Sequence, residues 1–186
     1  YDSPRSGGLI AINLKETDEV VSAALVSDHD ELLLVSRKGM SLRFPANEEQ
    51  IRSMGRSAGG VIGMKFRAGD ELLSMASIIG DGKDQYVFTA TDGGYAKRTK
   101  LDEYRQQGRG GIGVKAAKID EDSRGVLVGA MIVQPKDEIL AITSAGTVMR
   151  TPVEEIRETT RDTLGVRLVN LSGGNTVVSI ALVKEE

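Results

Sequence analysis

The chain has 186 residues, of which 40% are hydrophobic and 27% charged, and its formal net charge is −3. This composition fits a folded chain with a sizeable core, and we expect no membrane span or signal peptide, because no run approaches roughly 20 apolar residues and no apolar core follows a basic start. The absence of cysteine excludes disulfides and thiolate sites and fits a cytoplasmic location, and the net negative charge confines any nucleic-acid binding to a local basic stripe.

A two-part pattern recurs three times along the chain. Its first part is an apolar run, then a glycine, then a basic residue four positions later. The copies carry Gly39 and Arg43, Gly93 and Lys97, and Gly146 and Arg150. In the second part a basic residue follows a glycine by two positions, which gives Lys65, Lys115 and Arg167. A period of about fifty residues indicates a stacked or radial array.

The repeats set the expected organisation of the chain. A copy of the second part at residues 6–14 has no first part before it. We therefore predict one domain, residues 1–186, in which a half repeat at 1–27 precedes repeats at about 28–80, 81–134 and 135–186.

Within each repeat the local pattern is that of β-strands. Apolar runs at 31–35, 85–90 and 138–143 follow acidic turns and end at glycine-containing turns suited to tight hairpins. A return strand leads to a polar stretch, where Pro152 indicates a helical turn in the third copy. A glycine-led strand and a second apolar run follow, at 72–79, 126–133 and 177–183. We predict an all-β fold, a propeller-like partial ring of four-stranded antiparallel blades with about four strands from each repeat.

The glycine-rich segment from Gln107 to Gly113 is the most pointed local motif. Three of its glycines fit the dinucleotide-binding fingerprint, but that fingerprint requires a preceding buried strand and a following helix, and the flanking residues provide neither. Two interpretations stay open. The segment is either a connector between strands or an anion-binding loop, in which backbone N–H groups, Arg109 and Lys115 face a phosphate.

Other candidate sites are weaker. His29 lies between two aspartates, but it sits where turns recur before strands. The segment from Asp120 to Gly125 starts like a calcium loop, yet Arg124 takes a required ligand position and no glutamate follows at the right distance. One histidine and no cysteine leave little for a nucleophile–base pair. We expect no catalytic residue and no metal site.

Several of these segments resemble the C-terminal domain of the DNA gyrase A subunit. Residues 107–113 are similar to its glycine-rich basic box, with Gly108 and Ile112 where the box has basic residues. Residues 54–66, 93–99 and 163–171 are similar to its repeats, and the resemblance covers essentially the whole chain. It implies the later blades of a β-pinwheel, a ring of four-stranded blades that exchange strands with their neighbours and wrap DNA on the outer rim.

The resemblance implies a function for the whole assembly. The domain would bind double-stranded DNA independently of sequence and direct ATP-dependent negative supercoiling, together with the remainder of the gyrase A protein and with the B subunit in an A2B2 complex. This fragment would be non-catalytic and would need no cofactor, since ATP and magnesium act elsewhere in the enzyme. The C-terminal domain of the topoisomerase IV A subunit is an alternative, and a propeller-like protein-interaction scaffold is an alternative of another class.

Basic residues at equal positions in successive blades would form a charged track for DNA. We expect one set in Arg43, Lys97 and Arg150 and another in Lys65, Lys115 and Arg167. Ordinary solvated charges at strand ends are the alternative. The predicted DNA contacts are Arg43, Lys65, Lys97, Arg98, Gln107, Arg109, Gly110, Gly111, Gly113, Lys115, Arg150 and Arg167.

Overall fold

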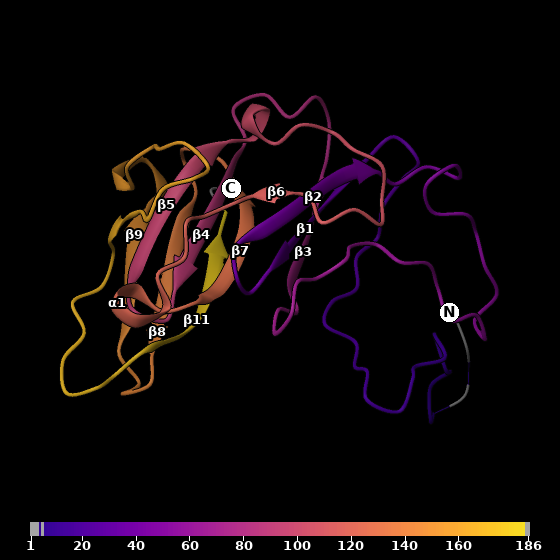
Figure 1. Cartoon of the computed structure of the whole chain (residues 1–186), viewed down its shortest axis with the longest axis horizontal. Coiled ribbons are helices and arrows are strands. Elements are labelled where there is room, and N and C mark those ends of the chain that lie inside the picture. The colour runs from indigo at the N-terminus through magenta and orange to yellow at the C-terminus, as the bar shows by residue number, and fades with distance from the viewer. Residues whose placement is uncertain (1–3, 5, 185–186) are drawn as a thin grey trace.

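The structure, a computed structural model, describes residue 4 and residues 6–184. Its strands form three antiparallel sheets that lie side by side (Figure 1), which confirms the predicted all-β blade array. In spatial order the first blade contains β3 (Leu72–Ile78), β1 (Glu31–Ser36), β2 (Met40–Pro45) and β6 (Val114–Lys115). The second contains β10 (Val166–Arg167), β5 (Tyr95–Lys100), β4 (Tyr86–Thr91) and β7 (Leu127–Val133). The third contains β11 (Val177–Val183), β8 (Glu138–Thr143) and β9 (Val148–Pro152).

Helical structure in the described residues is confined to single turns. The 3₁₀ turn η2 (Val153–Glu155) follows Pro152, as predicted, and η1 (Leu101–Glu103) occupies the same place in the preceding repeat. The short helix α1 (Glu121–Arg124) was not expected. The Asp120 side chain caps it by accepting a hydrogen bond from the Ser123 N–H at 3.2 Å.

Blades one and two each take their fourth strand from the next repeat. Strand β6 belongs to the second repeat but pairs with β2, and β10 belongs to the third repeat but pairs with β5. The prediction of about four strands from each repeat is confirmed for the second and third repeats, whereas the first repeat contributes three strands. The glycine-led segment of the first repeat, residues 59–66, is not a strand, and the third sheet has three strands.

Glycine makes this exchange possible at the point where the strand arrives. Gly113 has a φ of +82°, and a Cβ there would overlap the carbonyl oxygen of Ser41 on β2. Gly165 has a φ of +75°, and its Cβ would lie 2.6 Å from the Ala96 oxygen on β5. Each exchanged strand thus begins at a backbone position that combines left-handed geometry with close approach.

The blades are held together by apolar layers between the sheets. Successive residues of β4 point to opposite faces, and both faces are buried. Val87 packs with Leu33 and Leu127 between the first and second blades, whereas Phe88 packs with Ile139 and Val153 between the second and third. This burial on both faces explains why the first apolar run of each repeat is nearly continuous.

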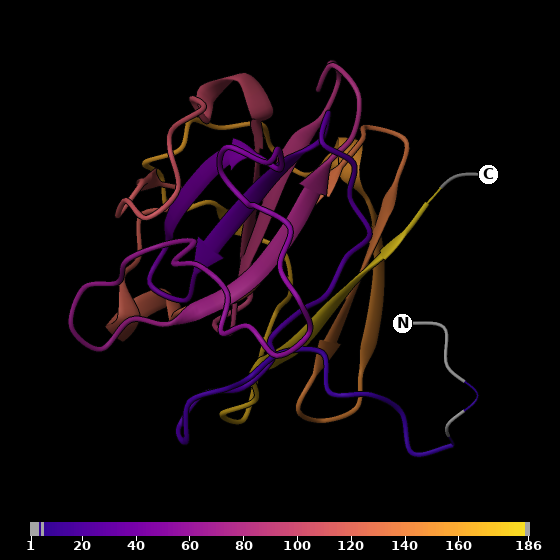
Figure 2. The same cartoon turned by 90° about the vertical axis from the view of Figure 1, so that its right-hand side faces the viewer.

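The last strand of each repeat lies at the inner edge of its sheet. Strand β7 contacts both β3 and β11, so these strands adjoin one another, while β6 and β10 lie at the opposite, outer edges. Residues 22–24 of the N-terminal half repeat border a hollow formed with Met75, Met131 and Leu182 from the three inner strands. The described part of the half repeat contains no strand and runs beside the sheets (Figure 2).

We predict that Gly113→Ala lowers the free energy of unfolding by about 2–4 kcal/mol, because it adds left-handed strain and a clash with β2. Gly146 is the matched control, since its φ is +78° but nothing lies within 4 Å of a Cβ there. Gly146→Ala should cost only the backbone strain, about 1 kcal/mol. Denaturant unfolding of both variants measures the difference, and equal losses would contradict the close-approach role.

Candidate nucleic-acid interface

Strand pairing corrects the first predicted set of cations. Arg43 lies opposite Leu33, Arg98 opposite Phe88, and Arg150 opposite Leu140. These three arginines therefore occupy equivalent positions, and Lys97 is not one of them. The reason is the glycine pair in the second hairpin, in which Gly94, with a φ of +81°, and not Gly93, is equivalent to Gly39.

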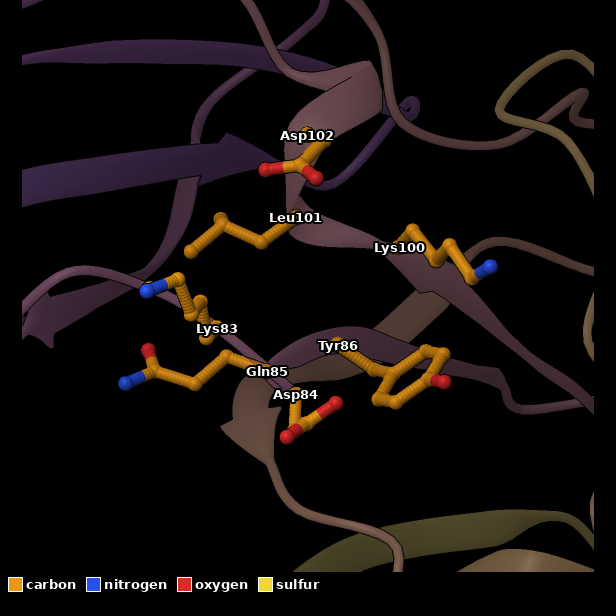
Figure 3. Close-up of a pocket in the computed structure, with 8 residues that line it drawn as sticks. Lys83, Asp84, Gln85, Tyr86, Lys100, Leu101 and Asp102 are labelled. Atoms are coloured by element: carbon orange, nitrogen blue, oxygen red, sulfur yellow. The ribbon is translucent and has the colours of Figure 1, made fainter.

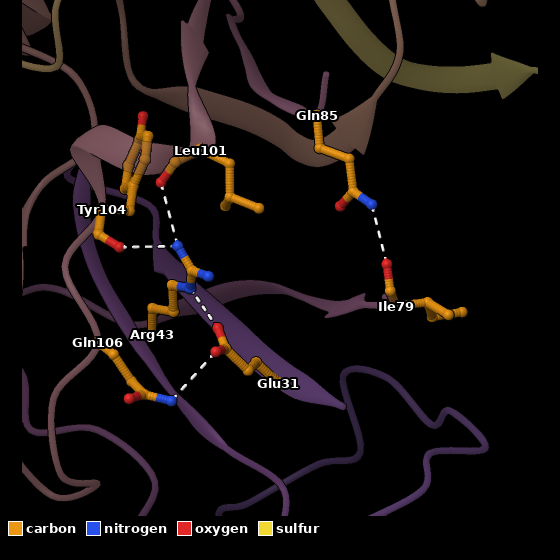
Figure 4. Close-up of polar contacts among 7 residues, drawn as sticks. All are labelled: Glu31, Arg43, Ile79, Gln85, Leu101, Tyr104 and Gln106. Carbon is orange, nitrogen blue, oxygen red and sulfur yellow. Dashed lines mark hydrogen bonds and ion pairs between the residues drawn. The ribbon is translucent and has the colours of Figure 1, made fainter. Parts of the chain in front are cut away.

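Arg43 connects the first blade to the second repeat (Figure 4). Its guanidinium pairs with the Glu31 carboxylate, and Nη1 donates to the carbonyl oxygens of Leu101 at 3.3 Å and Tyr104 at 3.2 Å. Gln106 Nε2 donates to the same carboxylate at 3.1 Å. With its side chain only 16% exposed, Arg43 holds the η1 turn against β2 and has little surface for DNA.

Arg98 makes the equivalent connection one blade further on. Its Nε donates to the Ile156 carbonyl at 2.7 Å and its Nη2 to the Glu154 carbonyl at 3.3 Å, so that it holds the η2 turn. The guanidinium lies 4.9 Å from the ring centre of Tyr86, the residue equivalent to Glu31. Arg150 pairs with Glu138 and stays 61% exposed.

Lys97 is buried and cannot belong to an exposed track. Its residue is 1% exposed, and its position is equivalent to Leu42 on β2. The ammonium donates to the carbonyl oxygens of Thr160 at 2.8 Å and Arg161 at 2.5 Å, and to Thr99 Oγ1 at 3.3 Å. Burial lowers the pKa of Lys97 to about 8, and the Glu103 carboxylate opposes that shift. Lys97 thus fixes the segment that leads into β10.

Replacing Lys97 should change how stability depends on pH. The unfolded chain keeps the lysine proton to a higher pH than the folded chain, so the contribution of Lys97 to stability rises as pH increases from about 8 towards 10. Relative to Lys97→Met, wild type should gain roughly 1–3 kcal/mol across that window. Lys83→Met, at an exposed lysine, should follow the wild-type curve in the same urea titrations. A constant difference between wild type and Lys97→Met would contradict the account.

The glycine-rich motif acts largely as a connector between repeats. Arg109 donates to the carbonyl oxygens of Gln50 and Ile62, the latter at 3.1 Å. The Gly110 N–H donates to the Gly63 carbonyl oxygen at 2.7 Å. The Gln107 backbone N–H donates to the Arg43 carbonyl oxygen at 2.8 Å. The Gln107 side-chain Nε2 is buried without a hydrogen-bond partner in the described structure. The motif thereby ties the second repeat to the first.

The second predicted set is exposed and in register. Lys115 pairs with Met40 in the β6–β2 ladder, and Arg167 pairs with Tyr95 in the β10–β5 ladder. Lys65 is the corresponding residue of the first repeat, two positions after Gly63, and its backbone N–H donates to the Gly111 carbonyl oxygen at 2.8 Å. All three residues are exposed. The two exchanged outer strands, β6 and β10, therefore each carry one exposed cation at an equivalent position of the ladder.

Sequence reasoning missed several side chains beside this set. Tyr95 lies between two guanidiniums, with the Arg124 carbon 4.3 Å and the Arg167 carbon 5.0 Å from its ring centre. Arg167 also donates to the Tyr95 hydroxyl at 2.7 Å. Arg67 and Lys118 are exposed and follow Lys65 and Lys115 by two and three residues. The signal available in the sequence was that Arg67 and Lys118 follow Lys65 and Lys115 so closely.

A separate hollow of about 240 Å³ lies at the other end of the β4–β5 hairpin (Figure 3). Two lysines, Lys83 and Lys100, and two aspartates, Asp84 and Asp102, line it, so its field has no single sign. In the described residues there is no group of three or more histidine, cysteine or acidic side chains placed to hold a metal. That part of the chain also has no helix long and apolar enough to cross a membrane.

An antiparallel blade array whose outer strands are exchanged between neighbours is a β-pinwheel, the propeller-like class that the sequence predicted. The family model described as "DNA gyrase C-terminal domain, beta-propeller" matches residues 1–27, 30–79, 85–134 and 137–184. The chain belongs to this family.

Known relatives are DNA gyrase A subunits. The chain is 60% identical to the DNA gyrase A subunit of Streptomyces coelicolor over 186 residues, which covers 97% of this chain and 21% of that protein. It is 50% identical to the DNA gyrase A subunit of Mycobacterium tuberculosis, covering 100% of this chain and 22% of that protein. The chain thus spans about a fifth of the length of these relatives.

Solved structures share the architecture. The C-terminal domain of DNA topoisomerase IV superposes with a TM-score of 0.86 at 29% identity, covering 94% of this chain and 53% of that one. A DNA gyrase A C-terminal domain superposes with a TM-score of 0.84 at 27% identity, covering 95% of this chain and 58% of that one. The fold is therefore common to the gyrase and topoisomerase IV domains.

Proposed function

We propose that the outer edge of this array binds the backbone of double-stranded DNA without reading its sequence. The observation that carries the proposal is the exposed register of Lys65, Lys115 and Arg167 on or beside the exchanged strands. Ammonium and guanidinium groups in such a row match a line of phosphates, and phosphate contacts carry no direct sequence information. Membership of the gyrase family supports the same conclusion.

The same register supports the proposal that the DNA is wrapped. Consecutive blades turn about the inner strands, so DNA that follows their outer edges must bend. Bending 20–30 base pairs costs on the order of 1–6 kcal/mol, which the phosphate contacts of several blades must offset together. Cations on successive blades meet this requirement better than one strong site. We therefore place the track on the second predicted set, Lys65, Lys115 and Arg167, and not on Arg43 and Lys97.

The proposed role in the cell is that of a non-catalytic part of DNA gyrase. In an A2B2 enzyme, the wrapped DNA would set the geometry of the strand crossing, so that ATP-driven strand passage introduces negative supercoils. The chemistry, ATP and magnesium would belong to other parts of the enzyme, and the location would be cytoplasmic. The relatives that are named as the A subunits of DNA gyrase support this assignment.

Binding to a long linear duplex across a salt series tests the proposal. We expect an affinity that is independent of sequence and falls steeply with salt, and Lys65→Ala and Arg167→Ala should each lower the salt slope by about 1. Lys83→Ala, at an exposed lysine outside the register, should leave the slope unchanged. Absence of binding at low salt, or equal slopes in all variants, would contradict the proposal and favour a protein-interaction scaffold.

A further inference from the structure

A recess of about 400 Å³ opens on the outer side between the first repeat and the segment of the second repeat that contains and follows β6. Four cationic side chains from three segments line it, namely Lys38, Arg67, Lys115 and Lys118, with Asp70 as its one acidic lining residue. Lys38 belongs to the β1–β2 turn and Lys115 to the exchanged strand β6. Strand exchange thus brings cations from two repeats to one hollow.

The acidic groups near the recess are already engaged. The Asp70 carboxylate accepts hydrogen bonds from Ser36 Oγ at 2.7 Å and from the Lys38 N–H at 2.9 Å, which fix the turn. Lys38 Nζ lies 3.3 Å from a carboxylate oxygen of Glu121 in α1. The side chains of Arg67 and Lys118 have no hydrogen-bond or ion-pair partner among the described residues. The lining residues of the recess thus include four cations and one acid, with Glu121 beside Lys38 and Asp120 near Lys118.

Asp162 lies over one of these cations. Lys115 Nζ donates to both of its carboxylate oxygens, at 2.9 and 3.1 Å. That hydrogen bond, with the charges of Lys115, Lys118 and Lys97, lowers the pKa of Asp162. Both partners remain about half exposed, at 51% and 56% of their side chains. An exposed ion pair of this kind is weak, so an incoming anion can displace the carboxylate.

The repeats show that this carboxylate is particular to one position on the rim. Gly113 and Gly165 are equivalent, so Asp162 takes the place that Gly110 takes one repeat earlier. Lys65, the equivalent of Lys115, has the glycine loop beside it, through the bond between its N–H and the Gly111 carbonyl. No carboxylate within ion-pair distance of Lys65 occurs in the described part of the chain. The two neighbouring rim positions thus differ by one acidic side chain.

We propose that this recess binds a phosphate group of double-stranded DNA and that Asp162 masks it until the phosphate displaces the carboxylate from Lys115. The inference rests on the proposed DNA-binding function and adds to it a site with a built-in competitor. DNA would engage the rim first at Lys65, where no acidic group competes, and reach the Lys115 position only after overcoming the electrostatic cost of displacing Asp162.

The test is a double-mutant cycle on the full 186-residue chain with a long linear duplex at fixed salt. Asp162→Asn should tighten binding about three- to tenfold, the effect of removing one repelling charge beside a phosphate. In a Lys115→Ala background the same change should have no more effect than Glu155→Gln. That control removes an exposed carboxylate in η2, outside the recess, with the same change in net charge. Asp162→Gly, which restores the residue of the preceding repeat, serves if the asparagine variant unfolds.

Several outcomes would overturn the inference. The masking role of Asp162 is contradicted if Asp162→Asn leaves the affinity for the duplex unchanged or raises it only as much as Glu155→Gln does. It is also contradicted if the gain in affinity persists in the Lys115→Ala background. Inorganic phosphate, followed through the amide resonances of Lys115 and Lys118, separates this inference from the proposed function. If the duplex does not bind but phosphate shifts these resonances more strongly in Asp162→Asn, the DNA assignment fails and the masked anion site stands. If phosphate shifts these resonances more strongly in Asp162→Asn but the affinity for the duplex is the same in both proteins, the recess binds phosphate and the proposal that this phosphate belongs to DNA is wrong.

Discussion

The pairing of each exchanged strand with the edge of the preceding blade is the interaction on which the rest of the structure depends. Strands β6 and β10 are only two residues long, and each arrives through a glycine that no other residue can replace without strain. Two ladder pairs alone could not hold such a short strand. Three cations near these strands supply additional hydrogen bonds to the next repeat, namely the partly buried Arg43 and Arg98 and the buried Lys97.

This arrangement divides the cations of the chain between two tasks. Those on β2 and β5 satisfy carbonyl oxygens of the following repeat, and removing them would leave polar backbone groups without partners. Those on the exchanged strands, Lys115 and Arg167, are exposed at the outer edge, and each has one exposed or partly exposed partner, Asp162 and Tyr95. The net charge of −3 is compatible with binding a polyanion. Many acidic residues lie in turns between strands, while the outer strands β6 and β10 carry the exposed cations Lys115 and Arg167.

Much of the fold could be predicted because apolar periodicity and turn chemistry are local. The six long apolar runs match β1, β3, β4, β7, β8 and β11 to within one residue at each end. The exchange could not be derived from the residues, since nothing local in a two-residue strand says which blade it joins; only the family resemblance implied it. Lys97 was misplaced for a related reason. Two consecutive glycines shift the count by one residue, and a lysine in an otherwise apolar position looks exposed until the Thr160 carbonyl that binds it is seen.

The central claim is that DNA contacts the exposed set Lys65, Lys115 and Arg167, and not the cations that β2 and β5 use to bind the next repeat. The chain contains no cysteine, so single cysteines at chosen positions can each carry a photoactivated cross-linker. With linear duplex, we expect strong cross-linking from Lys65→Cys, Lys115→Cys and Arg167→Cys and background levels from Lys83→Cys, in variants shown to be folded. Cross-linking that is uniform over all four positions, or concentrated at Lys83→Cys, would contradict the account.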